Sequence, residues 1–217
     1  MIKTIYHFVF LILLLSSCNP YTSTERHVFY LHGKIIETQG EHAISEDFGP
    51  YKFEEIIQAL EKTGAKVHRD IRSESTNFDA YTLKVSKQIS KLVESGIPPN
   101  LISVVGASKG GVMAMQISSQ NVYPINYVLL GANNQRIEEQ YTWILQGNVL
   151  GIYETTDKLA GKNYNHWINR SKQTSHFEQL EIKTGLGHGF LYTPRSEWLE
   201  PCLAWIDKYN KKYKRIR

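Results

Sequence analysis

Short apolar runs alternate along this chain with longer segments in which apolar residues recur at helical spacing. A strand of a parallel sheet is covered on both faces, so it reads as a continuous apolar run rather than an alternating one. The run LISVV at 101–105 is the clearest of this kind. The pattern predicts strands at 27–31, 66–70, 101–105, 125–130, 148–153 and 177–183.

Amphipathic segments lie between several of these strands. The segment 78–95, for example, places Tyr81 and Val85 on one face of a helix. The pattern predicts helices at 52–63, 78–95, 110–119 and 196–211. Strands that alternate with helices predict a single α/β domain, with a mostly parallel central sheet and helices on both faces. We expect no lid domain, and at most a short insertion at 131–146.

The first residues have the composition of an export signal. Lys3 supplies a positive charge, and the unbroken apolar run FVFLILLL follows at 8–15. That run is far shorter than the roughly 20 residues that cross a bilayer. It therefore predicts the apolar region of a signal peptide rather than a transmembrane helix.

The apolar run ends in Leu-Ser-Ser-Cys at 15–18, which resembles the lipobox of bacterial lipoproteins. In that family the signal is cut just before the cysteine, which is then acylated; Ser17 stands where the family usually has Gly or Ala. A plain signal peptide with an incidental cysteine is the alternative. The resemblance implies an exported, bacterial membrane-anchored lipoprotein, with a signal peptide at 1–17 and lipidation at Cys18. The polar, proline-containing residues 19–25 then predict a tether at 18–25, and the domain is predicted at 26–217.

The composition of the chain argues against nucleic-acid binding and metal binding. The chain has 217 residues, of which 41% are hydrophobic and 21% charged, as in an ordinary folded domain. Its net charge of +4 is small and partly due to residues 208–217, so we expect no nucleic-acid partner. If Cys18 is acylated, Cys202 has no partner, and its apolar neighbours predict a buried position. His42 and Glu46 are four residues apart without a second close histidine pair, so we expect no metal.

The strongest chemical signal is Gly-Ala-Ser-Lys-Gly at 106–110, a G-x-S-x-G motif between a predicted strand and a predicted helix. A sharp strand-to-helix turn lifts a serine hydroxyl clear of the sheet, and the flanking glycines remove Cβ atoms that would clash there. The helix N-terminus directs backbone N–H groups to the place where an oxyanion would form. This context predicts Ser108 as a nucleophile; glycines that serve only a tight turn beside an idle serine are the alternative.

The motif resembles the nucleophile elbow of the α/β-hydrolase superfamily, and two further segments follow in that superfamily's order of serine, acid and histidine. Glu-Thr-Thr-Asp at 154–157 follows a predicted strand, at the place of the acid. Thr-Gly-Leu-Gly-His-Gly-Phe at 184–190 follows the next predicted strand, at the place of the base. Leu-His-Gly at 31–33 is similar to the segment after the first core strand in small bacterial hydrolases of unknown substrate. The resemblance implies a serine triad and leaves the substrate open.

The triad roles follow from the chemistry of these side chains. Ser108 needs a base within hydrogen-bond reach, and His188 would take its proton and later deliver it to the leaving group. Asp157 would hold the imidazole tautomer and stabilise the imidazolium. Glu154 is the rival acid; we favour Asp157 because the acid normally lies in the loop rather than at the end of the strand. A histidine held only by the backbone of its loop is the alternative for His188.

An oxyanion hole needs two donors. The backbone N–H of Lys109, just after the nucleophile, is one by geometry, and we take Lys34, in the turn after the first strand, as the other. We expect both lysine side chains to be solvated; attraction of an acidic substrate is the alternative. The polar loop at 41–47 is expected to be a solvated surface loop; an edge of the pocket is the alternative. Trp143, Tyr164 and Trp167 are expected to serve packing rather than to line a cleft.

The residues together predict a serine hydrolase that cleaves an ester or related acyl bond of a small-molecule or acylated substrate through an acyl-serine intermediate. No cofactor is implied. A lipid-anchored binding or scaffold protein that keeps the fold with little turnover is the alternative, and the same residues would also support acyl transfer to an acceptor other than water. The basic residues 208–217 are expected to form a frayed helix end, with contact to anionic headgroups as a further hypothesis.

Overall fold

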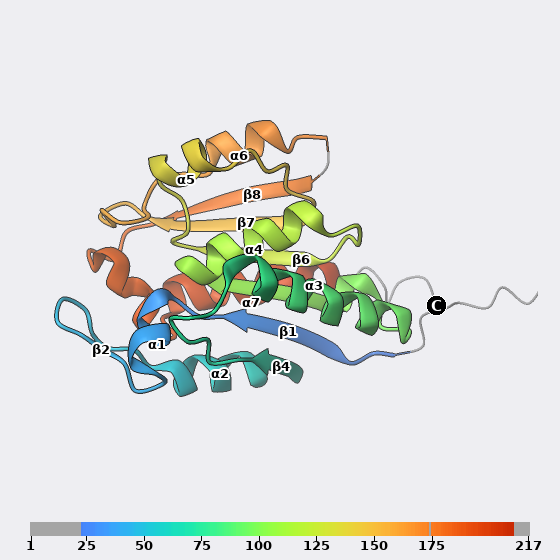
Figure 1. Ribbon diagram of the computed structural model, residues 1–217, viewed down its shortest axis with the longest axis horizontal. Helices are drawn as coiled ribbons and strands as arrows, with labels where there is room; N and C mark the ends of the chain where they lie inside the picture. Colours follow the sequence, from blue (N-terminus) through green and yellow to red (C-terminus); the bar gives the residue numbers. More distant parts are fainter. Residues whose placement is uncertain (1–22, 174, 211–217) are drawn as a thin grey trace, which may run out of the picture.

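In the computed structural model, which describes residues 23–173 and 175–210, six strands form one sheet in which all neighbouring strands run parallel (Figure 1). The strand order is β4-β1-β5-β6-β7-β8. The mostly parallel central sheet predicted from the apolar runs is confirmed. The strands are β1 (Arg26–Leu31), β4 (Ala65–Arg69), β5 (Ile102–Ala107), β6 (Asn126–Leu130), β7 (Gly147–Glu154) and β8 (Ser175–Ile182).

Helices cover both faces of the sheet, as predicted, and in Figure 1 α3 and α4 lie in front of it and α7 behind it. Successive residues of a strand point to opposite faces; in β1, Val28 and Tyr30 face one core, and Phe29 and Leu31 face the other. The first core is closed by α1 (Lys34–Gln39), α2 (Phe53–Glu61) and α7 (Ser196–Asn210). The second is closed by α3 (Phe78–Glu94), α4 (Lys109–Gln120) and α6 (Asn165–Arg170).

Several short elements were not predicted from the sequence. They have six residues or fewer, too few for a hydrophobic period to be visible. The segment 131–146, predicted as a short insertion, holds one of them. Besides α1 and α6, these elements are α5 (Gln135–Gln140), the hairpin strands β2 (Ile44–Ser45) and β3 (Gly49–Pro50), and the 3₁₀ turns Pro99–Leu101 and Gly187–Tyr192.

Parallel strands bring their carboxyl ends to one edge of a sheet. The chain leaves β1 at His32, β5 at Ser108 and β7 at Thr155, and after β8 it turns through residues 183–186 into the 3₁₀ turn that carries His188. Segments far apart in the sequence therefore meet at this edge, which is where an open α/β sheet binds its ligands.

The cores contain three residues that were predicted to be buried or to serve packing. Cys202 is fully buried and free, and burial raises the pKa of its thiol to about 12, so the predicted inert core position is confirmed. Tyr164 and Trp167 are fully buried in the second core. Both aromatic residues therefore serve packing, as expected.

The predicted signal peptide at 1–17 and the predicted lipidation site Cys18 lie outside the described residues, as do residues 211–217. Lys208, at the start of the basic terminal run, pairs with Glu178 at 2.7 Å. Within 23–173 and 175–210, no helix combines the length and the apolar character that a membrane span requires.

Candidate active site

Ser108 lies in a single-residue turn between β5 and α4. Its backbone has φ 53° and ψ −120°, and it is the one non-glycine residue with positive φ among those the structure describes. Such a conformation costs of order 1–3 kcal/mol and persists only where the surroundings hold it. Here the Ser108 N–H donates to the Leu130 carbonyl at 2.9 Å, and its carbonyl accepts from Gly111 N at 2.8 Å. The sharp turn predicted from the motif is therefore present.

Glycines allow this turn because neighbouring backbone leaves no room for a side chain. A Cβ on Gly106 would lie 2.4 Å from the Gly110 carbonyl oxygen. A Cβ on Gly110 would lie 1.9 Å from the carbonyl oxygen of Leu31, at the end of β1. The first turn of α4 thus packs directly against the end of β1, which places the serine beside the loop that follows β1.

Gly110→Ala is expected to lower the free energy of unfolding by about 3 kcal/mol or more, because the clashing atoms belong to rigid backbone. Gly185→Ala is the comparison, since Gly185 has φ +72° but no atom within 4 Å of the added Cβ. It is expected to cost about 1 kcal/mol from its backbone conformation alone. Urea unfolding of both variants measures the difference, and equal losses would contradict the steric argument.

Asp157, His188 and Ser108 form a continuous hydrogen-bonded chain. His188 Nδ1 lies 2.7 Å from Asp157 Oδ2, and His188 Nε2 lies 2.9 Å from Ser108 Oγ. Asp157 Oδ1 accepts from two backbone N–H groups, Leu159 at 2.8 Å and Ala160 at 3.1 Å, so the carboxylate has a fixed orientation. A proton on Nδ1 directed at this buried carboxylate leaves Nε2 free to accept from the serine hydroxyl.

Glu154, the rival acid, lies at the end of β7 and has a different set of partners. One oxygen accepts from the backbone N–H groups of Thr184 at 2.9 Å and Gly185 at 3.0 Å. The other accepts from the backbone N–H of Thr156 at 2.7 Å and from its hydroxyl. The pKa of Glu154 is lowered: burial opposes this, but the hydrogen bonds from Thr156, Gly185 and Thr184 together outweigh it. Glu154 braces the two loops that carry Asp157 and His188 and does not contact the imidazole.

The backbone groups chosen as oxyanion donors both begin helices. Lys109 is the first residue of α4 and Lys34 the first of α1, and the first N–H groups of a helix have no partner within it. An ideal Cβ on Gly33 would lie 3.5 Å from the Ser108 Cβ, so the chain that leads into α1 runs directly beside the serine. The structure therefore brings Lys34, Lys109 and the predicted triad residues Ser108, Asp157 and His188 to one place.

The lysine side chains differ from each other. Lys34 is exposed, as expected. Lys109 was expected to be solvated, but its ammonium pairs with the buried carboxylate of Glu37, and only 29% of the Lys109 side chain is exposed. The sequence gives no signal for this pair, because its two partners are 72 residues apart.

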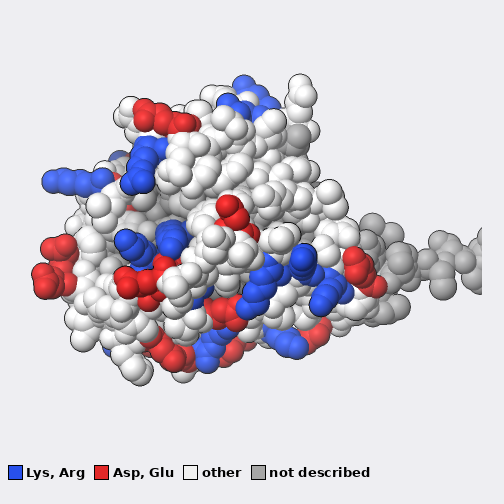
Figure 2. Space-filling view, in the orientation of Figure 1, with Lys and Arg blue, Asp and Glu red and all other residues white. Residues whose placement is uncertain are grey.

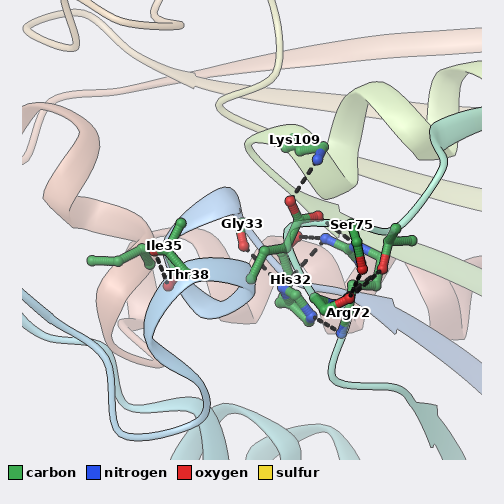
Figure 3. Close-up of polar contacts among 10 residues, drawn as sticks. His32, Gly33, Ile35, Thr38, Arg72, Ser75 and Lys109 are labelled. Carbon is green, nitrogen blue, oxygen red and sulfur yellow. Dashed lines mark hydrogen bonds and ion pairs between the residues drawn. The ribbon is translucent and has the colours of Figure 1, made fainter.

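His32 is fully buried and holds the turn after β1 (Figure 3). Its Nδ1 donates to the Gly33 carbonyl at 2.8 Å, and its Nε2 accepts from the backbone N–H of Arg72 at 2.9 Å. Burial, and secondly the charge of Arg72, lower the pKa of His32 to about 4. The imidazole is therefore neutral at physiological pH and acts as a structural link between two loops.

We expect stability to fall as the pH falls from about 6.5 to about 4. The unfolded chain protonates His32 near its ordinary pKa of about 6.5, whereas the folded chain does so only near 4. Between these values the unfolded state binds more protons, so the free energy of unfolding decreases by about 3 kcal/mol from this residue. Because burial also lowers the pKa of His68 to about 4, the informative measurement compares wild type with His32→Gln. The same slope of melting temperature against pH in both proteins would exclude His32 as the source.

A cavity of about 320 Å³ opens beside Ser108 and His188. Figure 2 shows a hollow on this face, with basic side chains at its edge where α1 and α4 begin. The walls are mostly apolar, as in a pocket for an acyl group or another hydrophobic moiety. The larger apolar lining residues are Ile35, Phe48, Tyr51, Val112, Ile137, Leu159, Leu191 and Tyr192.

Phe48 and Tyr51 come from the segment around the β2–β3 hairpin. The sequence prediction considered the polar residues 41–47 of this segment and did not include Phe48 or Tyr51. Glu41 and His42, in the same segment, line a separate depression with Tyr51, Phe53 and their neighbours. Trp143 is not among the residues that line the cavity at Ser108 and instead stacks on Tyr141. Within the described part of the chain, no group of three His, Cys, Asp or Glu side chains is arranged to hold a metal ion.

No protein-family model matches this chain. No curated protein matches its sequence. ATU1826 from Agrobacterium tumefaciens, a protein of unknown function described as an α/β hydrolase, matches with a TM-score of 0.60 at 14% identity, over 88% of each chain. MGS-M1, an α/β hydrolase enzyme from a Medee basin deep-sea metagenome, gives a TM-score of 0.56 at 15% identity, over 87% of this chain and 86% of its own.

SOBER1 from Arabidopsis thaliana also gives a TM-score of 0.56, at 13% identity, over 85% of this chain and 99% of its own. These similarities extend over most of the chain. Together with the parallel sheet and the flanking helices, they define the α/β-hydrolase fold.

Proposed function

We propose that this protein is a serine hydrolase that cleaves an ester or related acyl bond through an acyl-serine intermediate. The observation that carries the proposal is the chain of hydrogen bonds from Asp157 through His188 to Ser108, with heavy-atom distances of 2.7 and 2.9 Å. A serine becomes an effective nucleophile when a base lies within hydrogen-bond reach and a third group orients that base. The apolar cavity beside the serine supports an acyl substrate.

In the proposed reaction, Ser108 Oγ attacks the carbonyl carbon of the substrate while His188 Nε2 takes the hydroxyl proton. The tetrahedral oxyanion accepts from the backbone N–H groups of Lys109 and Lys34. The bond to the leaving group then breaks, and His188 returns its proton to the departing oxygen. Water then attacks the acyl carbon while His188 takes one of its protons. The bond between the acyl carbon and Ser108 Oγ breaks, and His188 gives that proton to Oγ, which releases the acid and restores the Ser108 hydroxyl.

The test is reaction of the folded protein, residues 26–217, with a fluorophosphonate, which attaches covalently to an activated serine with loss of fluoride. We expect one adduct, mapped by mass spectrometry to the peptide that contains Ser108. In His188→Ala we expect labelling to be at least a hundredfold slower, because the general base is missing. Folded wild type that does not label would instead support a binding protein that keeps the fold.

We further propose that the protein is exported and lipid-anchored at Cys18. The support is the Leu-Ser-Ser-Cys sequence after a short apolar run. In a bacterial host the full chain is expected to incorporate a radiolabelled fatty acid, and Cys18→Ser is expected to abolish incorporation. Incorporation that persists in this variant would contradict the assignment.

A further inference from the structure

One buried carboxylate connects the two helices whose first residues supply the proposed oxyanion donors. Glu37 lies on α1, and its carboxylate is only 1% exposed. One oxygen accepts from Arg72 Nε at 2.9 Å, and the other pairs with the ammonium of Lys109, the residue after the nucleophile. Figure 3 shows these contacts converging from three segments of the chain.

Arg72 extends the network back to the end of β1. Its Nη2 donates to the carbonyl of His32, and its backbone N–H donates to the imidazole of the same residue. The His32 imidazole in turn donates to the carbonyl of Gly33, which precedes Lys34. The polar network therefore surrounds the turn that places Lys34 beside the serine.

The helix α1 needs such contacts because it has only six residues. An isolated helix of that length is unstable in water, so tertiary contacts must hold it. Ile36 anchors one side of α1 in the core, and Glu37 anchors the other through its two ion pairs. By contrast, α4 has twelve residues and is packed against the end of β1 through Gly110.

The charges on Glu37, Arg72 and Lys109 oppose a displacement of α1. A carboxylate removed from water is strongly disfavoured unless cations and hydrogen bonds replace the lost solvation. Glu37 has two cations, one from α4 and one from the loop after β4, and it loses part of this compensation if α1 moves away from either of them. A displacement of α1 relative to the serine therefore carries an electrostatic cost.

We propose that Glu37 is a positioning residue that fixes the backbone N–H of Lys34 relative to that of Lys109, and so sets the geometry of the oxyanion hole. The inference rests on the proposed hydrolase function. It assigns to Glu37 a role in transition-state stabilisation that acts through other groups, because its carboxylate contacts Lys109 and Arg72 rather than the serine or the histidine.

The first variant is Lys109→Met, which keeps an unbranched side chain one atom shorter, and the Glu37–Arg72 pair, but removes the ion pair that links α1 to α4. We expect kcat for a short-chain p-nitrophenyl ester, and the rate of fluorophosphonate labelling, to fall 10- to 100-fold, with KM changed less than threefold. Loss of one oxyanion donor costs about 10²–10³ in kcat, and a displaced donor costs less. Lys109→Arg, which can still pair with Glu37, is expected to recover most of the labelling rate.

The second variant is Glu37→Gln, which removes the charge at the centre of the network and is expected to lower kcat at least as much. The matched control is Lys84→Met, because Lys84 forms an exposed pair with Asp70 at 2.8 Å and lies outside the site. It is expected to leave kcat within twofold of wild type. Circular dichroism at the assay temperature shows which variants are folded, and only those are compared.

Three outcomes distinguish a failure of the positioning role from a failure of the proposed hydrolase function. If Lys109→Met is folded and its kcat and labelling rate stay within twofold of wild type, the positioning role is wrong, even if its melting temperature is lower. If Glu37→Gln does not fold, Lys109→Met alone decides. If wild type itself does not label, the proposed hydrolase function fails, and the positioning role fails with it.

Discussion

Ser108→Ala is expected to lower kcat for a short-chain ester by about 10⁵-fold, with little change in the melting temperature. Removing the hydroxyl removes the only atom that forms the proposed acyl intermediate, and loss of a triad nucleophile costs effects of this size in serine hydrolases. The residual rate would come from substrate binding and from the oxyanion donors, which still act on an attacking water. The backbone at this position is strained, and alanine adopts φ 53° no more easily than serine does, so the strain is unchanged.

The measurement is steady-state hydrolysis of p-nitrophenyl esters of increasing chain length by the purified domain. Ser75→Ala is the matched control, because Ser75 is exposed and lies in the loop after β4, and its rate is expected to equal that of wild type. A Ser108→Ala protein that keeps more than a hundredth of the wild-type kcat would show that another group performs the chemistry.

Asp157→Asn is expected to lower kcat by about 10³- to 10⁴-fold while KM changes little. The amide cannot accept the Nδ1 proton of His188 as the carboxylate does, so the imidazole loses both its tautomer preference and the counter-charge for the imidazolium. Asp157 Oδ1 also accepts from Leu159 and Ala160, and an asparagine oxygen can keep those two bonds. The loop is therefore expected to keep its shape.

Glu154→Gln is the comparison that separates the two candidate acids. Both carboxylate oxygens of Glu154 accept hydrogen bonds, one from Thr156 and the other from Thr184 and Gly185. In Glu154→Gln the NH₂ group replaces one of these oxygens and faces donors with which it cannot pair. The variant is therefore expected to lower the free energy of unfolding by about 2 kcal/mol. At a temperature where the variant is folded, kcat is expected to fall less than tenfold. A thousandfold loss in Glu154→Gln together with a near-normal Asp157→Asn would reverse the assignment.

The sheet, the long helices and the sharp turn at Ser108 could be predicted from the sequence because each has a local cause. The run at 101–105 is apolar because β5 is buried on both faces, and the glycines of 106–110 are present because backbone leaves no room for a Cβ. The prediction ended β5 two residues early, since Gly106 and Ala107 have small side chains that an apolar pattern does not register.

The network around Glu37 could not be predicted in the same way. Glutamate, arginine and lysine are normally exposed, so the sequence gives no reason to bury Glu37 and Arg72 together. Their contact joins positions 35 residues apart and depends on where β4 ends relative to α1. The sequence alone also could not decide between Asp157 and Glu154. The two residues are only three positions apart and both are buried, so their roles depend on the geometry of the loop.

The order of the site residues along the chain has a consequence for synthesis. Ser108 and His188 are 80 residues apart, and His188 follows β8, the last strand to be made and an edge of the sheet. Before β8 is in place, the growing chain has no His188 beside Ser108 to act as the proposed base. The serine is thus expected to be latent until the sheet is complete. The time at which a denatured sample regains phosphonate labelling would then report the docking of the final strand rather than formation of the turn itself.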